Sequence, residues 1–168
     1  PDAEGGPFSG GHIDFENSGD GSSTVTLQKA STFNNCNASS APYISYMFAE
    51  IPGFSKFGSF EGNGASGSGG DGSFIELGFR PALFMWKNID SSTNGHWVVM
   101  DTSRNRYNVS DSTLWWSLSN AADTGEAKID FLSNGVKNRG GTSARYNADG
   151  ETFIYAAWAE NQFAGTSP

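Results

Sequence analysis

Residues 73–86 read SFIELGFRPALFMW and place two different strand patterns next to each other. In the first pattern, Ile75, Leu77 and Phe79 alternate with a charged or small residue, as expected for a strand with one buried face. Pro81 ends this strand, because proline cannot donate to a β-ladder. In the second pattern, residues 82–86 are continuously apolar, which is typical of a strand covered on both faces. This stretch therefore favours a β fold.

Strand patterns of the same kind recur along the rest of the chain, with turn residues between them. Residues 96–100 and 153–159 are apolar segments bounded by Asn, Gly and Asp. Residues 128–132 and 136–137 flank Ser-Asn-Gly, and Asn-Gly favours a hairpin because both residues tolerate positive φ. Residues 114–118 fit either a short strand or a surface turn. Together these patterns predict an all-β fold of antiparallel sandwich-like or jelly-roll-like units.

The composition agrees with this fold class and argues against two classes of partner. The chain has 22 Gly, 13 Phe, 5 Trp and 5 Tyr, and no stretch has the 3.6-residue period of an amphipathic helix. Ten Lys and Arg stand against 18 Asp and Glu, for a net charge of −8. Because no basic run is present, nucleic-acid binding is disfavoured. No apolar run approaches the roughly 18 residues of a membrane span, so we expect no membrane insertion.

Two pairs of segments repeat in the same order and with nearly the same spacing. GHIDF at 11–15 is matched by AKIDF at 127–131, and YISYMFAE at 43–50 by FIYAAWAE at 153–160. We expect each pair to form equivalent strands in two similar units, one partial and one complete.

The repeat predicts three parts of the chain. Residues 1–56 are the C-terminal half of a preceding unit, residues 57–73 a Gly/Ser-rich connection, and residues 74–168 the second unit. Half a sandwich cannot bury its apolar face alone, so sequence that completes the first unit is expected before Pro1.

Several of these segments resemble a known family. GFRPA at 78–82, WVVMD at 97–101, IDFLSNG at 129–135 and YAAWAEN at 155–161 are similar to a repeated β-domain of bacteriophage tail-fibre and other virion-surface proteins. The resemblance is to the marine-phage type, in which the unit often lies next to a laminin-G-like or concanavalin-like sandwich. It implies a structural or attachment role at a virion surface and brings no catalytic residues with it.

Four residues are candidates for ligand contact: Tyr107, Asn108, Trp115 and Trp116. Flat aromatic rings stack on sugar rings, while an amide beside them bonds hydroxyl groups. Two alternatives remain for the tryptophan pair. One ring can fill the core, and the other can pack on a neighbouring subunit.

Acidic residues at strand positions are the candidates for a glycosidase pair: Asp14, Glu50, Glu76, Asp130 and Glu160. Four of them form repeat pairs, and duplicated carboxylates fit a structural role better than a catalytic one. We expect Asp130 and Glu160 to bond backbone N–H groups or to pair with Arg104 or Arg139.

The remaining reactive side chains give no motif. His12 and His96 are the only histidines and Cys36 is the only cysteine, without HExxH or CxxC spacing. His96 is expected to make a hydrogen bond at a turn end. The sequence therefore predicts a non-enzymatic protein without a metal or cofactor.

These observations predict a virion-surface structural protein, a phage tail fibre or spike that contributes to host attachment. Its expected partners are other virion proteins and a host surface glycan. The alternatives are a secreted carbohydrate-binding module and a structural subunit of a capsid decoration or extracellular filament. We also expect a homo-oligomer in which Trp115, Trp116 and Phe163 are buried between subunits. The resemblance to tail fibres favours a trimer.

Overall fold

The structure is a computed structural model that describes residues 13–17, 23–27, 42, 44, 46–65, 71–91, 93, 95–140 and 145–160. The first two ranges are described as backbone, as is residue 126. The chain divides into a smaller unit, residues 5–48, and a larger unit built on residues 49–168. In the described ranges we find no helix with the length and apolarity needed to cross a membrane.

The smaller unit contains an antiparallel hairpin. Strand β1 (Ile13–Asn17) pairs with β2 (Ser23–Leu27), and Ile13 lies opposite Leu27. The matching segment at 129–131 also lies in a strand that leads into an antiparallel hairpin. This pair of repeated segments thus has the same local structure.

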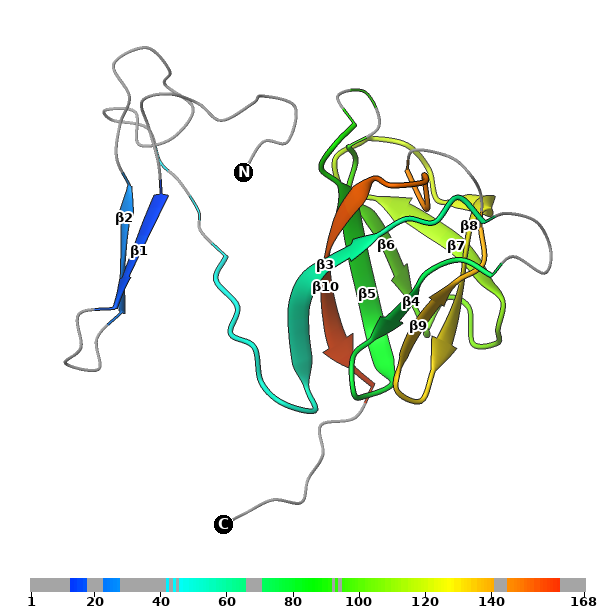
Figure 1. The fold of residues 1–168 in the computed structure, drawn as a ribbon, viewed down its shortest axis with the longest axis horizontal. Helices are drawn as coiled ribbons and strands as arrows, with labels where there is room; N and C mark the ends of the chain where they lie inside the picture. The colour runs from blue at the N-terminus through cyan, green and yellow to red at the C-terminus, as the bar shows by residue number, and fades with distance from the viewer. Residues whose placement is uncertain are drawn as a thin grey trace. The chain divides into compact units, whose positions relative to one another are not determined.

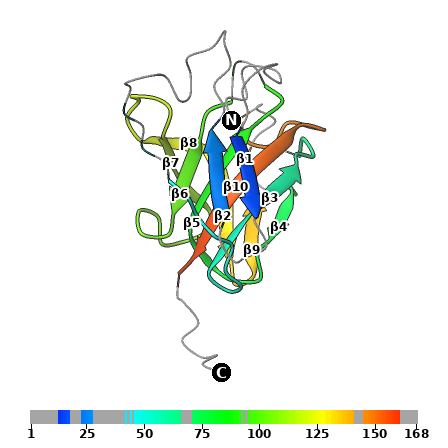
Figure 2. The same cartoon turned by 90° about the vertical axis from the view of Figure 1, so that its left-hand side faces the viewer.

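In the described part of the larger unit, eight antiparallel strands form one sheet, which confirms the all-β prediction (Figure 1). They are β3 (Ser55–Glu61), β4 (Phe74–Glu76), β5 (Pro81–Asn88), β6 (Val98–Asp101), β7 (Ser110–Trp115), β8 (Asp123–Leu132), β9 (Gly135–Asn138) and β10 (Thr152–Ala159). Their order in the sheet is β3-β10-β5-β6-β7-β8-β9-β4. The last strand in sequence therefore lies between β3 and β5, as Figures 1 and 2 both show.

The sheet curls until it is nearly closed into a barrel, whereas the sequence suggested sandwich-like units. Strand β7 joins the two parts of the sheet, β3-β10-β5-β6 and β8-β9-β4. Its C-terminal residues pair with β6, its other residues pair with β8, and a register shift lies between Ser110 and Ser112. Between these two residues the partner on β8 changes from Ile129 to Thr124, so the extra residues lie on β8, around Gly125, and β8 is the strand that bends. The sheet is therefore continuous from β3 at one end to β4 at the other.

One apolar core fills the inside of the curled sheet. Its largest fully buried members include Phe84, Trp86, Phe131 and Phe153. Alternation of inward and outward side chains explains why Phe84 and Trp86 belong to this core while Met85 between them does not.

The second pair of repeated segments does not share a structure, so that part of the prediction is wrong. Residues 153–159 lie in β10, which has partners on both sides. In residues 42–50, the described positions lie outside any strand, with Ile44 81% and Tyr46 79% exposed. An apolar segment becomes a strand only where neighbouring strands are present to pair with it. The two sequences are similar, but only β10 has such neighbours.

The predicted connection, residues 57–73, also begins later than expected. Residues 57–61 belong to β3 and pair with β10. The Gly-rich segment that follows lies between β3 and β4 of the same unit. Most of the predicted half-unit 1–56 lies outside the described residues.

Candidate functional site

The outer face of the sheet carries a second apolar cluster across β3, β10, β5, β6 and β7. Met85, Val99 and Ala156 are buried there beneath larger side chains that are partly exposed. These larger side chains are Phe57, Leu83, Trp97, Leu114 and Trp158. A curled sheet whose inside is already full therefore carries a further apolar surface on its outside.

Strand register arranges this cluster as one continuous row. Met85 lies opposite both Ala156 and Val99, Val99 lies opposite Leu114, and Ala156 lies opposite Phe57. Cross-strand neighbours on one face are in contact distance. The row therefore spans five strands of the curled sheet.

Two tryptophans lie at the β6–β7 side of this surface. The backbone N–H of Trp116 donates to the carbonyl of Trp97 at 3.2 Å, so the two residues are cross-strand neighbours. Trp116 is 63% exposed, and Trp97 is partly buried. Ser117 Oγ accepts the N–H of Trp97 and lies 3.2 Å from Nδ1 of His96. His96 thus makes the expected turn-end hydrogen bond.

Trp115 is a core residue and not a surface residue. It is 6% exposed, its ring centroid lies 6.1 Å from that of Tyr146, and the Arg145 guanidinium lies 5.2 Å from its ring centroid. Alternation along β7 turns Leu114 outward and Trp115 inward. The expectation that Trp115 would be buried between subunits is therefore wrong, because it is already buried in its own chain.

The other two predicted site residues lie at the opposite end of β7. Tyr107 is 83% exposed. The amide of Asn108 bonds both backbone groups of Phe131, donating to its carbonyl at 3.2 Å and accepting its N–H at 2.9 Å. The Asn108 side chain therefore takes the place of a neighbouring strand at this point of β8 and is not free for a ligand. The six residues of β7 separate this pair from Trp116 by about 20 Å.

The sequence prediction thus included Trp116, which is an exposed aromatic side chain, but missed its neighbour Trp97. The signal for Trp97 was present. If Val98 and Met100 face the core, then Trp97 must face outward with Val99.

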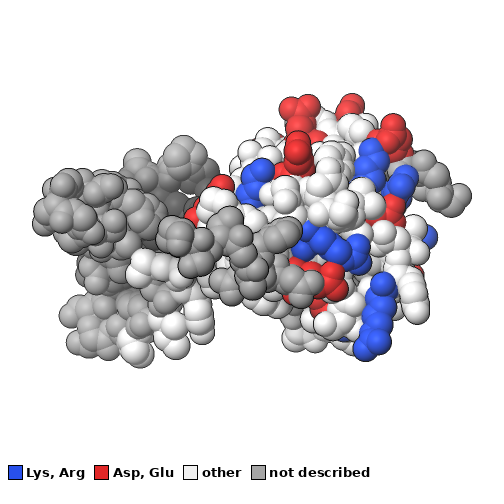
Figure 3. All heavy atoms as spheres, turned by 90° about the horizontal axis from the view of Figure 1, so that it is seen from below, with Lys and Arg blue, Asp and Glu red and all other residues white. Residues whose placement is uncertain are grey.

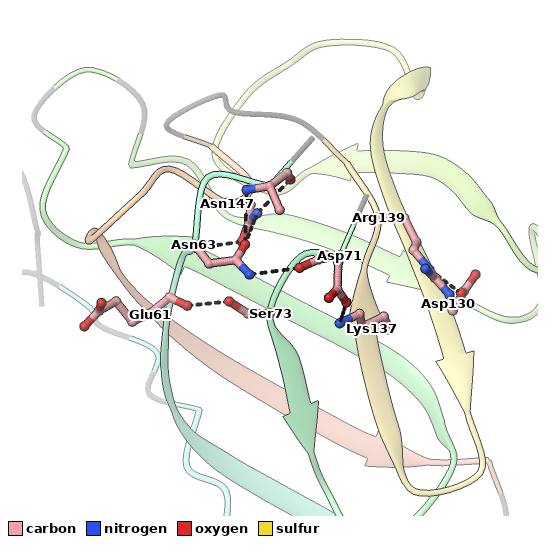
Figure 4. Close-up of polar contacts among 9 residues, drawn as sticks. Glu61, Asn63, Asp71, Ser73, Asp130, Lys137, Arg139 and Asn147 are labelled. Atoms are coloured by element: carbon pink, nitrogen blue, oxygen red, sulfur yellow. Dashed lines mark hydrogen bonds and ion pairs between the residues drawn. The ribbon is translucent and has the colours of Figure 1, made fainter. Parts of the chain in front are cut away.

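A polar network fastens the loops at one end of the sheet (Figure 4). Asn147, which is fully buried, donates to Asn63 Oδ1 at 2.8 Å and to the carbonyl of Ala65 at 3.1 Å. Asn63 in turn donates to the carbonyl of Asp71 at 2.9 Å. Lys137 binds the Asp71 carboxylate, and its hydrogen bond and charge hold the pKa of Asp71 below the ordinary value.

The same region joins the two ends of the sheet, where β3 and β4 do not pair as strands. Ser73 Oγ donates to the carbonyl of Glu61 at 2.6 Å, and Lys56 Nζ donates to the carbonyl of Glu76 at 3.0 Å. We call this junction the seam. Side chains, rather than a backbone ladder, link its two strands.

The carboxylates considered as catalytic candidates have structural partners or are exposed. Asp130 is buried and pairs with Arg139 Nε at 2.6 Å, which confirms one expected pair. Glu160 pairs with Arg80 at 2.7 Å instead of Arg104 or Arg139. Glu50 and Glu76 are exposed.

Other sequence candidates fall outside the described residues. His12, Cys36, Phe163 and the side chain of Asp14 are in this group. Among the described residues, no group of three His, Cys, Asp or Glu side chains could hold a metal ion.

Charges are mixed on the larger unit's face drawn in Figure 3, where Lys and Arg alternate with Asp and Glu over white surface. Arg104 pairs with Asp101, whose carboxylate also accepts the backbone N–H groups of Ser103 and Arg104. Burial tends to raise the pKa of Asp101. The hydrogen bonds and charge of Arg104 outweigh that effect and leave it lowered.

The fold and the outer surface define an all-β domain with an aromatic external face. The chain belongs to a family described as a domain of unknown function (DUF7483), whose match covers residues 7–162. No curated protein and no solved structure matches the chain.

Proposed function

We propose that this chain is a non-enzymatic structural module of a virion-surface protein, a phage tail fibre or spike that contributes to host attachment. The observation that carries the proposal is the apolar outer face, with Trp97, Trp116 and Trp158 on a sheet whose interior is already filled. An exposed aromatic surface of this kind is typical of contact with a partner or ligand. The resemblance of residues 57–164 to virion-surface domains supplies the setting.

The roles of the acidic side chains support a structural rather than a hydrolytic function. A glycosidase needs two carboxyl groups that flank a substrate, one of them able to donate a proton. Here Asp130, Glu160 and Asp101 are engaged by arginines of the same chain. Carboxylates that pair with arginines of their own chain are held in the fold and are not free to flank a substrate.

Oligomerisation is part of the same proposal. Trp116, Tyr46 and Ile44 are 63%, 79% and 81% exposed, and burial of such side chains between copies would stabilise an assembly. A trimer is favoured by the resemblance to tail fibres, and closed symmetry would cover the surface without polymerisation. Light scattering of the 168-residue chain tests this, and a stable monomer at high concentration would contradict it.

Immunogold labelling tests the location. Antibodies raised against the 168-residue chain are applied to purified particles and to fractionated cells of the source culture. Label on tail fibres or spikes supports the proposal. Label confined to the cell fraction, with none on particles, would overturn it.

A secreted carbohydrate-binding module is the second candidate, and the exposed Trp116 beside Trp97 favours it. The same labelling separates the two. A carbohydrate-binding module of an enzyme would be found in the cell-free medium and not on particles.

A further inference from the structure

We propose that Lys87, Trp97 and Trp116 form a binding site for an acidic glycan on the outer face of the sheet. One sugar ring would stack on the tryptophans while its carboxylate or sulfate binds the lysine. The site would define the class of ligand for the proposed attachment role. The proposal of the site rests on the proposed function only for where the glycan comes from.

Lys87 is the first part of the site. It is one of the few buried charged residues, with 9% of its surface exposed. It points outward, since its neighbour Trp86 lies in the core. Gly95 covers its stem, because a Cβ placed on Gly95 would lie 3.4 Å from Lys87 Cε.

Within the described residues, the Lys87 ammonium has no hydrogen bond or ion pair. An ammonium held out of water without a partner is unfavourable. The fully enclosed polar atoms without a partner are Ser110 Oγ, Thr113 Oγ1 and Asp130 Oδ1, so the Lys87 ammonium still reaches the surface. A largely buried stem with an accessible, unpaired cation is arranged to bind an anion.

The tryptophans are the second part of the site. Trp86 lies opposite Val98 in the β5–β6 register, and continuing that register places Trp97 beside Lys87. The backbone hydrogen bond between Trp116 and Trp97 then adds the exposed ring of Trp116 on the far side of Trp97. Lysine and tryptophans therefore lie in one row across β5, β6 and the end of β7.

This combination of groups selects the ligand class. Aromatic faces bind the apolar side of a sugar ring, and the indole N–H groups can bond its hydroxyls. A lysine binds carboxylate and sulfate as a point charge. The net charge of −8 opposes the approach of an anion at long range, but a lysine with no partner among the described residues gives an acidic glycan a local ion pair that a neutral one cannot make.

Titration calorimetry on the 168-residue chain tests the site with three probes: a galacturonate oligosaccharide, a sulfated dextran and unsubstituted dextran. We expect binding of at least one acidic probe and weaker binding of dextran. Trp116→Ala should weaken binding of every probe about tenfold. Lys87→Met keeps the apolar stem and should reduce acidic-probe affinity about tenfold, to the level of dextran, while Lys87→Arg should retain most of it.

Tyr107→Ala is the matched control, because Tyr107 is also an exposed aromatic residue but lies at the other end of β7. Its affinities should equal those of the wild type. Circular dichroism checks that Lys87→Met folds. If it does not fold, the affinities of Trp116→Ala and Lys87→Arg decide whether the site exists. Absence of acidic-glycan binding, equal affinity for dextran, or wild-type affinity in Trp116→Ala would each overturn the proposal.

The two proposals fail separately. Labelled virions with a chain that binds no acidic glycan would leave the structural function standing and remove this site. Acidic-glycan binding by a chain absent from virions would leave this site standing and overturn the proposed function.

Discussion

Asn147 and Asn63 bond each other across 84 positions of sequence, Asn147 Nδ2 donating to Asn63 Oδ1 at 2.8 Å. The backbone N–H of Asn63 donates back to Asn147 Oδ1 at 3.3 Å. One buried side chain thus holds the loop after β3 against the loop before β10. The pair fastens the seam at the end where Ser73 meets Glu61.

Replacing Asn147 by Ala should therefore destabilise the larger unit. The change removes three hydrogen bonds and leaves the Ala65 carbonyl without this donor. We expect a loss of about 2 kcal/mol in the free energy of unfolding, measured by urea denaturation. Asn120→Ala, at an exposed position, is the control. Equal midpoints for the two variants would contradict the role of Asn147.

Gly135→Ala should displace β4 from the sheet. A Cβ at position 135 would lie 2.1 Å from the carbonyl oxygen of Ile75, which is too close for any rigid arrangement. We expect a cost of about 1–3 kcal/mol, with the largest loss of amide protection in β4. Hydrogen exchange by NMR measures both. Ser133→Ala, in the adjoining turn, should behave as the wild type, and an unaltered β4 in Gly135→Ala would show that the backbone can yield there.

Arg139→Met should destabilise the fold by leaving the Asp130 carboxylate buried without its cation. Complete burial of such a charge costs 3–5 kcal/mol, but the Arg139 side chain is 36% exposed, so about 2 kcal/mol is expected. Thermal unfolding gives the measurement. Adding Asp130→Asn should recover part of the loss. Arg106→Met, at an exposed arginine, serves as the control, and a similar loss there would argue against the pair.

The lowered pKa of Asp101 predicts a contribution to stability that depends on pH. Because the folded-state pKa lies below the ordinary 3.8, the contribution is complete above that value and is lost as pH falls through the folded-state value. The difference in unfolding free energy between wild type and Asp101→Asn should therefore shrink as the pH is lowered from about 4 to 2. In an Arg104→Met background this change should be smaller. A constant difference across the range would contradict it.

Local patterns predicted the strands well because strand chemistry is local. The alternation at Ile75, Leu77 and Phe79, and the apolar run before Lys87, correspond to buried residues in and beside β4 and β5. The all-β class followed from these patterns. The curled single sheet did not, because it depends on the register shift between β7 and β8, whose extra residues include Gly125 with a φ of 101°, and a single glycine does not identify such a shift in the sequence.

Gly135 shows how a correct prediction can rest on the wrong cause. The hairpin was inferred from Asn-Gly on the ground of positive φ, yet the described glycines with positive φ are Gly53, Gly64, Gly78, Gly125 and Gly150. Gly135 pairs with Leu132 and is small because Ile75 lies against it. That contact comes from a strand about sixty residues away, so the sequence around the turn could not reveal it.

The candidate site was only partly predictable for a similar reason. The residue type alone made Trp116 a candidate for ligand contact. Whether Trp115 is buried depends on which face of β7 packs against Tyr146, and this contact comes from the tertiary structure. Asn108 looked available for a ligand until its amide was found on the backbone of Phe131. The local sequence did not indicate that Lys87 is buried, because Gly95, across the next loop, packs against its side chain.

The position of β10 between β3 and β5 has a consequence for biosynthesis. Strands β3 and β5 both pair with β10, so neither has its full set of neighbours until residue 159 has been made. While the chain is being translated, the facing edges of β3 and β5 are unpaired, and Phe84 and Trp86 lack part of their cover. Such contacts between distant residues slow folding and leave apolar edges open to aggregation. We therefore expect a nascent chain truncated before residue 152 to need chaperone protection, and the unit to become compact only when its last strand is released from the ribosome.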